Sequence, residues 1–244
     1  MKMAFFVIFL LLSGCSGVRL QENNNTDKIA RTHTELAGLY FERDRMGVAL
    51  SEITLALQAD PNYAPAFNVR GLIYMSLRED QKADADFLQS LRLNKTDSET
   101  QNNYGWFLCQ RGKEKESIGH FLAALENPLY ATPERAYLNA GICDHKAGEF
   151  KGAEDFLQRA LVLQPQYPQA LQALAELKFS QGDYLAASHY FTRQKRENLT
   201  ADQLWLGVRI ERGVGNAKAE ASYSSQLRQR YPDAQETQLL PHEE

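Results

Sequence analysis

Small residues return along this chain at a nearly constant interval. The intervals between them are 34, 34, 36, 34 and 34 residues, and the residues are Ala49, Ala83, Ser117, Ala153, Ala187 and Ala221. A period of this length holds two helices and two turns, and such units stack because one hairpin cannot bury its apolar face alone. The spacing therefore predicts an all-α chain of stacked helical hairpins.

A second column of small residues lies 12 positions before the first. Its members are Ala37, Gly71, Gly105, Gly141 and Ala175, and the sixth place holds Arg209. Large apolar residues follow the first column by four positions, and they are Ile53, Phe87, Phe121, Leu157 and Phe191. Small side chains allow two helices to cross closely, so we expect each second-column residue to mark a crossing.

An aromatic residue follows the second column by three positions at Tyr40 and Tyr74, and Pro61 and Pro165 close the first and fourth units. This order of small, aromatic and large residues, closed by a proline, resembles the tetratricopeptide repeat. The resemblance implies a right-handed superhelix, an α-solenoid, of six hairpins between residue 30 and about residue 232. The expected units are residues 30–63, 64–97, 98–133, 134–167, 168–201 and 202–232. In the sixth unit Arg209 and Arg212 replace small and aromatic residues, so we expect a polar cap there and a polar tail over residues 233–244. An ordinary helical bundle would leave the near-equal intervals unexplained.

The N-terminus carries a targeting pattern. Lys2 precedes an apolar run over residues 3–12, which is too short to span a bilayer and has the length of a signal-peptide core. The sequence Leu-Leu-Ser-Gly-Cys over residues 11–15 resembles the lipobox of bacterial lipoproteins. The resemblance implies removal of residues 1–14 and acylation of Cys15; the alternative is a chance cysteine after an ordinary cleavable signal.

The residue after Cys15 is Ser16 rather than aspartate, which in such lipoproteins implies delivery to the outer membrane, with the chain facing the periplasm. We expect residues 15–29 to form a lipidated, flexible tether because they are largely polar. Without residues 1–14 the chain has 26 basic and 31 acidic residues, a net charge of −5. This charge does not favour nucleic acid as a partner.

Two further cysteines, Cys109 and Cys143, are 34 residues apart on the expected first helices of adjacent units. Neighbouring helices can bring inward-facing cysteines within bonding distance, and disulfides persist in the periplasm. We expect a structural disulfide that ties the third unit to the fourth; the alternative is two buried, reduced thiols.

The histidines do not suggest a catalytic or metal site. His33, His120, His145, His189 and His242 show no zinc-protease spacing, and the sequence has no glycine-rich phosphate loop. Cys143 and His145 would point about 200° apart on a helix, which prevents ligation of one metal by this pair. We expect no enzyme activity, cofactor or small-molecule substrate.

The repeat resemblance implies that the first helix of each hairpin lines a concave binding face. The residues expected in this groove are Phe41, Asn68, Leu72, Met75, Asn102, Trp106, Leu138, Ile142 and Phe179. Asparagine amides can pair with a peptide backbone while apolar residues accept its side chains. The alternative for each apolar residue is packing between repeats.

Three segments carry a narrower resemblance: residues 102–109, residues 127–136 and residues 138–143. They are similar to the PilF/PilW family of type IV pilus biogenesis lipoproteins, and so are the lipobox, the six repeats and the cysteine pair. The 36-residue interval falls at Pro128 and Pro133, which favour an extended connection over a tight turn.

The family resemblance implies a pilotin. Such a protein binds the secretin subunit of the pilus machine, escorts it to the outer membrane and promotes its assembly into a ring, without a cofactor. Two alternatives are a repeat lipoprotein that serves as an adaptor for β-barrel insertion or for cell-wall hydrolases, and an envelope enzyme whose site is not recognisable in the sequence.

Overall fold

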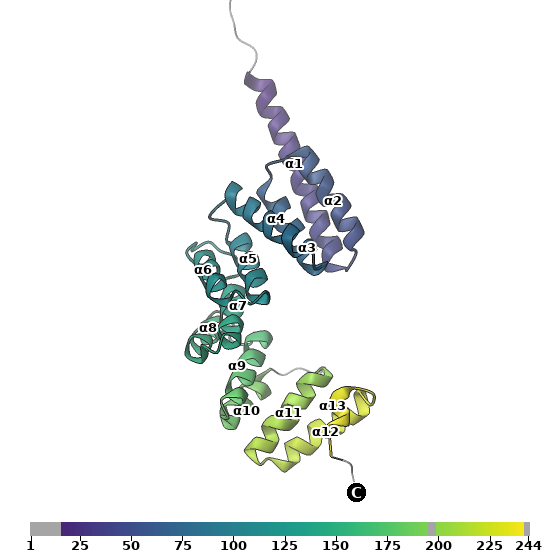
Figure 1. The fold of residues 1–244 in the computed structure, drawn as a ribbon, viewed down its shortest axis with the longest axis vertical. Coiled ribbons are helices and arrows are strands. Elements are labelled where there is room, and N and C mark those ends of the chain that lie inside the picture. The colour runs from purple at the N-terminus through teal and green to yellow at the C-terminus, as the bar shows by residue number, and fades with distance from the viewer. Residues whose placement is uncertain (1–15, 195–198, 242–244) are drawn as a thin grey trace, which may run out of the picture. The chain divides into compact units, whose positions relative to one another are not determined.

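The structure, a computed structural model, describes residues 16–194 and 199–241, with side chains from residue 25 onward (Figure 1). Within these ranges the chain forms thirteen helices and no strand. The predicted all-α class is therefore confirmed. The signal segment and Cys15 lie outside the described residues. No helix of the described ranges combines the length and the apolar character that crossing a membrane requires.

The chain divides into two compact units, Met1–Lys95 and Thr96–Glu244, and each is described by itself. The helices of the first unit are α1 (Ser16–Glu42), α2 (Met46–Ala59), α3 (Ala64–Ser76) and α4 (Asp80–Leu93). Those of the second are α5 (Ser98–Gln110), α6 (Glu114–Leu125), α7 (Pro133–Lys146), α8 (Phe150–Leu163), α9 (Pro168–Ser180), α10 (Tyr184–Arg193), α11 (Ala201–Val214), α12 (Ala217–Arg230) and α13 (Gln235–Gln238). Helices α1 to α12 pack in consecutive pairs, which are the predicted hairpins.

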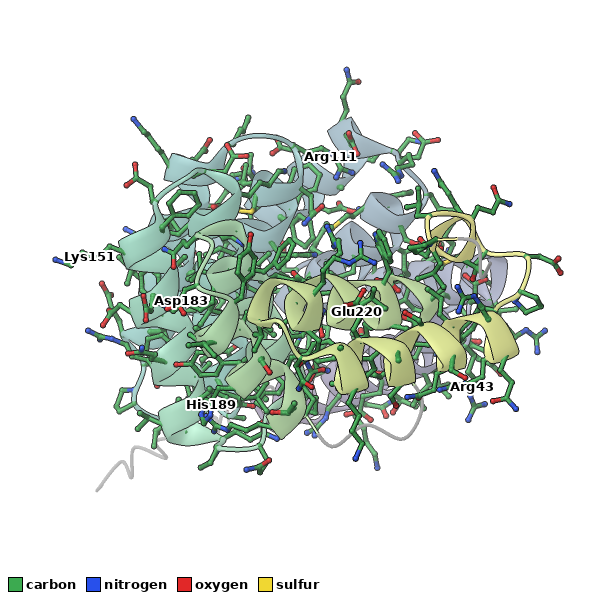
Figure 2. All side chains as sticks on the ribbon, turned by 90° about the horizontal axis from the view of Figure 1, so that it is seen from below. Arg43, Arg111, Lys151, Asp183, His189 and Glu220 are labelled. Atoms are coloured by element: carbon green, nitrogen blue, oxygen red, sulfur yellow. A yellow bond between two sulfur atoms is a disulfide. The ribbon has the colours of Figure 1, made fainter. Side chains whose placement is uncertain are left out.

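Each hairpin reverses at a residue with positive φ. These residues are Asp44, Arg78, Gly112, Gly148, Gly182 and Gly215, with φ between 57° and 81°. Glycine adopts this left-handed conformation without a steric cost, which explains its use at four of the six turns. Outside the turns, polar side chains such as that of Lys151 on α8 extend away from the helices (Figure 2).

The two columns of small residues mark the helix crossings. A Cβ placed on Gly71 would lie 2.9 Å from the Phe87 ring, and one on Gly141 would lie 2.5 Å from Leu157 Cγ. The first column is fully buried at Ala49, Ala83, Ser117, Ala153 and Ala187. The small residues therefore mark where the paired helices approach most closely. The large apolar residue four positions after each first-column residue fills the space at that crossing.

The sixth hairpin corrects the predicted register. Ala221 is exposed, and the glycine at the crossing is Gly207, whose added Cβ would lie 2.9 Å from Phe191 and 3.0 Å from Tyr223. Gly207 follows Ala175 by 32 residues instead of 34, so the assignments of Arg209 and Ala221 to the columns were wrong. The physical reason is that a crossing between two aromatic rings has room only for a residue without a side chain.

Both ends of the repeat array also differ from expectation. Helix α1 begins at Ser16, so residues 16–29 are helical rather than a flexible tether. No proline interrupts this segment, and Ala30 and Ala37 bury one face of the helix. At the other end the tail is not purely polar, because Leu240 is 5% exposed and packs into the core of the last hairpins.

Candidate protein-binding surfaces

A disulfide joins the first helices of the third and fourth hairpins. Cys109 on α5 and Cys143 on α7 are bonded, with 5.8 Å between their Cα atoms, and both are fully buried. The Ser117 hydroxyl lies 2.9 Å from Cys143 Sγ, and Lys146 Nζ donates a hydrogen bond to the Cys109 carbonyl at 2.8 Å. In the structure the two cysteines therefore form a disulfide rather than two reduced thiols.

The proline-bounded link between α6 and α7 is anchored at its centre. Tyr130 is buried beside Ala124 and Ala136, and burial raises the pKa of its phenol to about 12. The Leu129 amide donates to Asn127 Oδ1 at 3.0 Å, which shapes the turn, while the Leu129 side chain is 88% exposed. The link therefore holds one aromatic residue inside and presents one apolar residue outside.

In the first unit, the predicted binding residues lie on α1 and α3. Phe41, Leu72 and Met75 are half-buried, so part of each side chain is accessible. Asn68 is 8% exposed, so its amide belongs to the packed interior. Little of the Asn68 side chain is therefore available to a partner, and its assignment to a binding groove stays a prediction.

In the second unit the predicted residues divide in the same way. Trp106 and Ile142 are half-buried, and Trp106 packs against the disulfide cluster. Asn102 is fully buried, and its Oδ1 accepts a hydrogen bond from Asn139 Nδ2 at 3.0 Å. Leu138 is 7% exposed within the core cluster of α7, α8 and α9. Asn102 and Leu138 therefore contribute to packing, and their assignment to a binding groove stays a prediction.

Two histidines of the second unit take part in this packing. His120 Nδ1 lies 2.6 Å from Gln101 Oε1, an acceptor, and burial lowers the pKa of the imidazole. His145 Nε2 lies 3.2 Å from the Ser180 hydroxyl, and burial lowers the pKa of this ring as well. Both shifts favour the neutral form. In the part of the chain that the structure describes, no group of three or more His, Cys, Asp or Glu residues has the arrangement of a metal site.

The hairpins, their crossings and their turns define a class of protein. Residues 64–97 match the tetratricopeptide repeat family. Together with the repeated hairpins on either side of this segment, the match makes the fold a tetratricopeptide repeat α-solenoid, a class that binds other proteins along its stacked helices.

Comparison with solved structures narrows the class. The crystal structure of PilW, described as a widely conserved type IV pilus biogenesis factor, superposes with a TM-score of 0.81 and 39% sequence identity, covering 86% of this chain and 97% of that one. The chain therefore belongs to the PilF/PilW family.

Two matches to Pseudomonas aeruginosa PilF agree with this assignment. The type IV pilus assembly protein PilF of that organism is 26% identical over 242 residues, 95% of each chain. The solved structure of P. aeruginosa PilF superposes with a TM-score of 0.79 at 24% identity, which supports the fold. The similarity to PilF therefore covers nearly the whole repeat array and is not confined to a single hairpin.

Proposed function

We propose that this protein is an outer-membrane pilotin of type IV pilus biogenesis. It binds the pilus secretin, promotes delivery of the secretin to the outer membrane and promotes its assembly into the multimeric ring. The observation that carries the proposal is the 39% identity to PilW across 97% of that chain. A non-enzymatic scaffold suits this role, because a client subunit needs a surface to bind rather than a reaction.

In this proposal, lipidation of Cys15 anchors the protein to the outer membrane. The lipobox resemblance over residues 11–15 supports it, and acyl chains hold a protein at a membrane without a spanning helix. Helix α1 begins at Ser16, directly after Cys15 in the sequence, and carries Phe41 near its other end, so one helix connects the anchor with the proposed binding surface.

The accessible apolar side chains of α1 and α3 form the proposed secretin-binding surface. Phe41, Leu72 and Met75 are half-buried, which leaves apolar area that a partner can cover. Such a surface would shield an aggregation-prone segment of the secretin before the ring assembles.

Deletion of the gene tests the role. We expect the heat-resistant secretin multimers and the surface pili to disappear together, and the wild-type gene to restore both. A Cys15→Ala variant should accumulate as a folded protein yet fail to restore outer-membrane multimers, because it lacks the anchor. Normal multimers in the deletion strain would contradict the pilotin proposal, and normal multimers with Cys15→Ala would contradict the anchor alone.

A matched pair of variants tests the binding surface. Met75→Glu places a charge among the half-buried residues of α3 and should weaken secretin binding by about tenfold or more, since a desolvated, unpaired charge is costly. Leu88→Glu on α4, where the leucine is 44% exposed, should leave binding unchanged. Affinity is measured by biolayer interferometry on purified secretin, with thermal unfolding to verify the fold. Equal affinities of the two variants would place the interface elsewhere.

A further inference from the structure

Arg209 on α11 is held between two aromatic rings. Its Cζ lies 4.8 Å from the centroid of Phe179 on α9 and 5.7 Å from the centroid of Trp205, one turn earlier on α11. Arginine over an aromatic face is stabilised by the ring quadrupole, and the contact restricts the side chain. The guanidinium is therefore positioned before any partner arrives.

The same guanidinium has no acceptor among the described residues. Arg209 Nε is buried and makes no hydrogen bond, and no described carboxylate lies within ion-pair distance of the side chain. Other half-buried cations differ: Arg70 makes two 2.7 Å hydrogen bonds to Asp86, and Lys178 lies 2.6 Å from Glu154. Polar groups in protein interiors are almost always hydrogen-bonded, so a half-buried guanidinium without an acceptor stands out and remains available to an acceptor from a partner.

Apolar surface continues along α11 beside Arg209. Gly213 lies one turn later, and a Cβ there would be 2.5 Å from the Tyr184 ring, so this ring rests directly on the glycine. Tyr184 is 37% exposed and its ring centroid lies 5.7 Å from that of Phe179. The cation is thus framed by aromatic rings that leave part of their area accessible.

We propose that Arg209 binds a carboxylate of a protein partner, within an acidic segment that also carries apolar side chains. A carboxylate would accept two parallel hydrogen bonds from the terminal Nη1 and Nη2 groups of this guanidinium, a pairing that is stronger and more specific than a neutral one. The rings of Phe179, Tyr184 and Trp205 would contact the apolar side chains beside that carboxylate. A carboxylate fits better than a phosphate because Arg212, one turn later on α11, is already paired with Glu220, which leaves the single guanidinium of Arg209 to match a single negative charge.

This site is built from residues of α9, α10 and α11 in the second unit, whereas the proposed secretin-binding residues belong to α1 and α3 of the first. It therefore goes beyond the proposed function and does not depend on it. Arg212 provides the natural control, because it is exposed and donates a hydrogen bond at 2.8 Å to Glu220 of α12.

Isothermal titration calorimetry with two capped pentapeptides tests the proposal. The peptides are acetyl-Gly-Leu-Glu-Phe-Gly-amide and its glutamine analogue. We expect the glutamate peptide to bind the wild-type protein about tenfold more tightly than the analogue, since a charge-assisted pair exceeds a neutral one. Arg209→Gln should abolish this preference, Arg209→Lys should retain only part of it, and Arg212→Gln should retain it fully.

Thermal unfolding of each variant separates binding from folding, and Arg209→Lys preserves the charge if Arg209→Gln proves unstable. Equal affinities for the two peptides, failure of the glutamate peptide to bind, or an unchanged preference in Arg209→Gln would each overturn the proposal. Tighter binding of inorganic phosphate than of the glutamate peptide would also overturn it. None of these measurements involves the secretin, so their outcome is independent of the pilotin proposal.

Discussion

Replacing Cys109 and Cys143 together with alanine should lower the free energy of unfolding of the second unit by about 3–4 kcal/mol. The disulfide closes a loop of 34 residues, and releasing that loop increases the conformational entropy of the unfolded chain. Urea denaturation followed by circular dichroism measures the change. The helical signal before unfolding should stay the same, because each cysteine lies within a helix that packs on its own hairpin partner.

Reducing agent supplies the control for this prediction. The wild-type protein should lose a similar amount of stability when the disulfide is fully reduced, whereas the double alanine variant should be insensitive to reductant. A wild-type protein whose unfolding is the same in both conditions would show that the bond does not contribute to stability.

Gly141→Ala should destabilise the fourth hairpin by about 1–3 kcal/mol, the usual range for overpacking. The added Cβ would lie 2.5 Å from Leu157 Cγ and 3.1 Å from the Ala153 carbonyl oxygen, so a side chain and a backbone would both have to move. The midpoint of thermal or urea unfolding reports the effect.

Gly119→Ala is the matched substitution, because Gly119 also lies within a helix but a Cβ there meets nothing within 4 Å. Alanine is the better helix former, so this variant should be more stable than wild type by about 0.5–1 kcal/mol. Two variants of equal stability would mean that the crossing at Gly141 relaxes without cost.

Helical hairpins could be predicted because their determinants are local and periodic. Gly71, Gly105 and Gly141 recur at a repeat interval, and each meets the large residue 16 positions later in the same hairpin. The sixth hairpin could not be placed in this way, because Gly207 contacts Phe191 of the preceding hairpin as well as Tyr223 of its own. The register of the sixth hairpin therefore depends on Phe191 as well as on Tyr223. Extrapolating the spacing of the earlier units does not take the contact with Phe191 into account.

Candidate binding residues were harder to predict than the fold. Helical position places Asn102 and Trp106, four residues apart, on one face of α5, yet Asn102 is buried while Trp106 is partly accessible. Burial depends on how deeply adjacent helices pack, which residue type and spacing do not specify. Residues on one face of a helix can therefore have different roles.

By itself the sequence determined the repeat, the helical class and the pair of cysteines, since a fixed interval and a residue type are visible without coordinates. Only the tertiary structure decided that Cys109 and Cys143 lie within bonding distance, that the last repeat shortens to 32 residues, and that Arg209 has aromatic neighbours but no described carboxylate partner. The physical reason is that an unpaired charge is a property of its surroundings in space. Those surroundings come from helices that are distant along the chain.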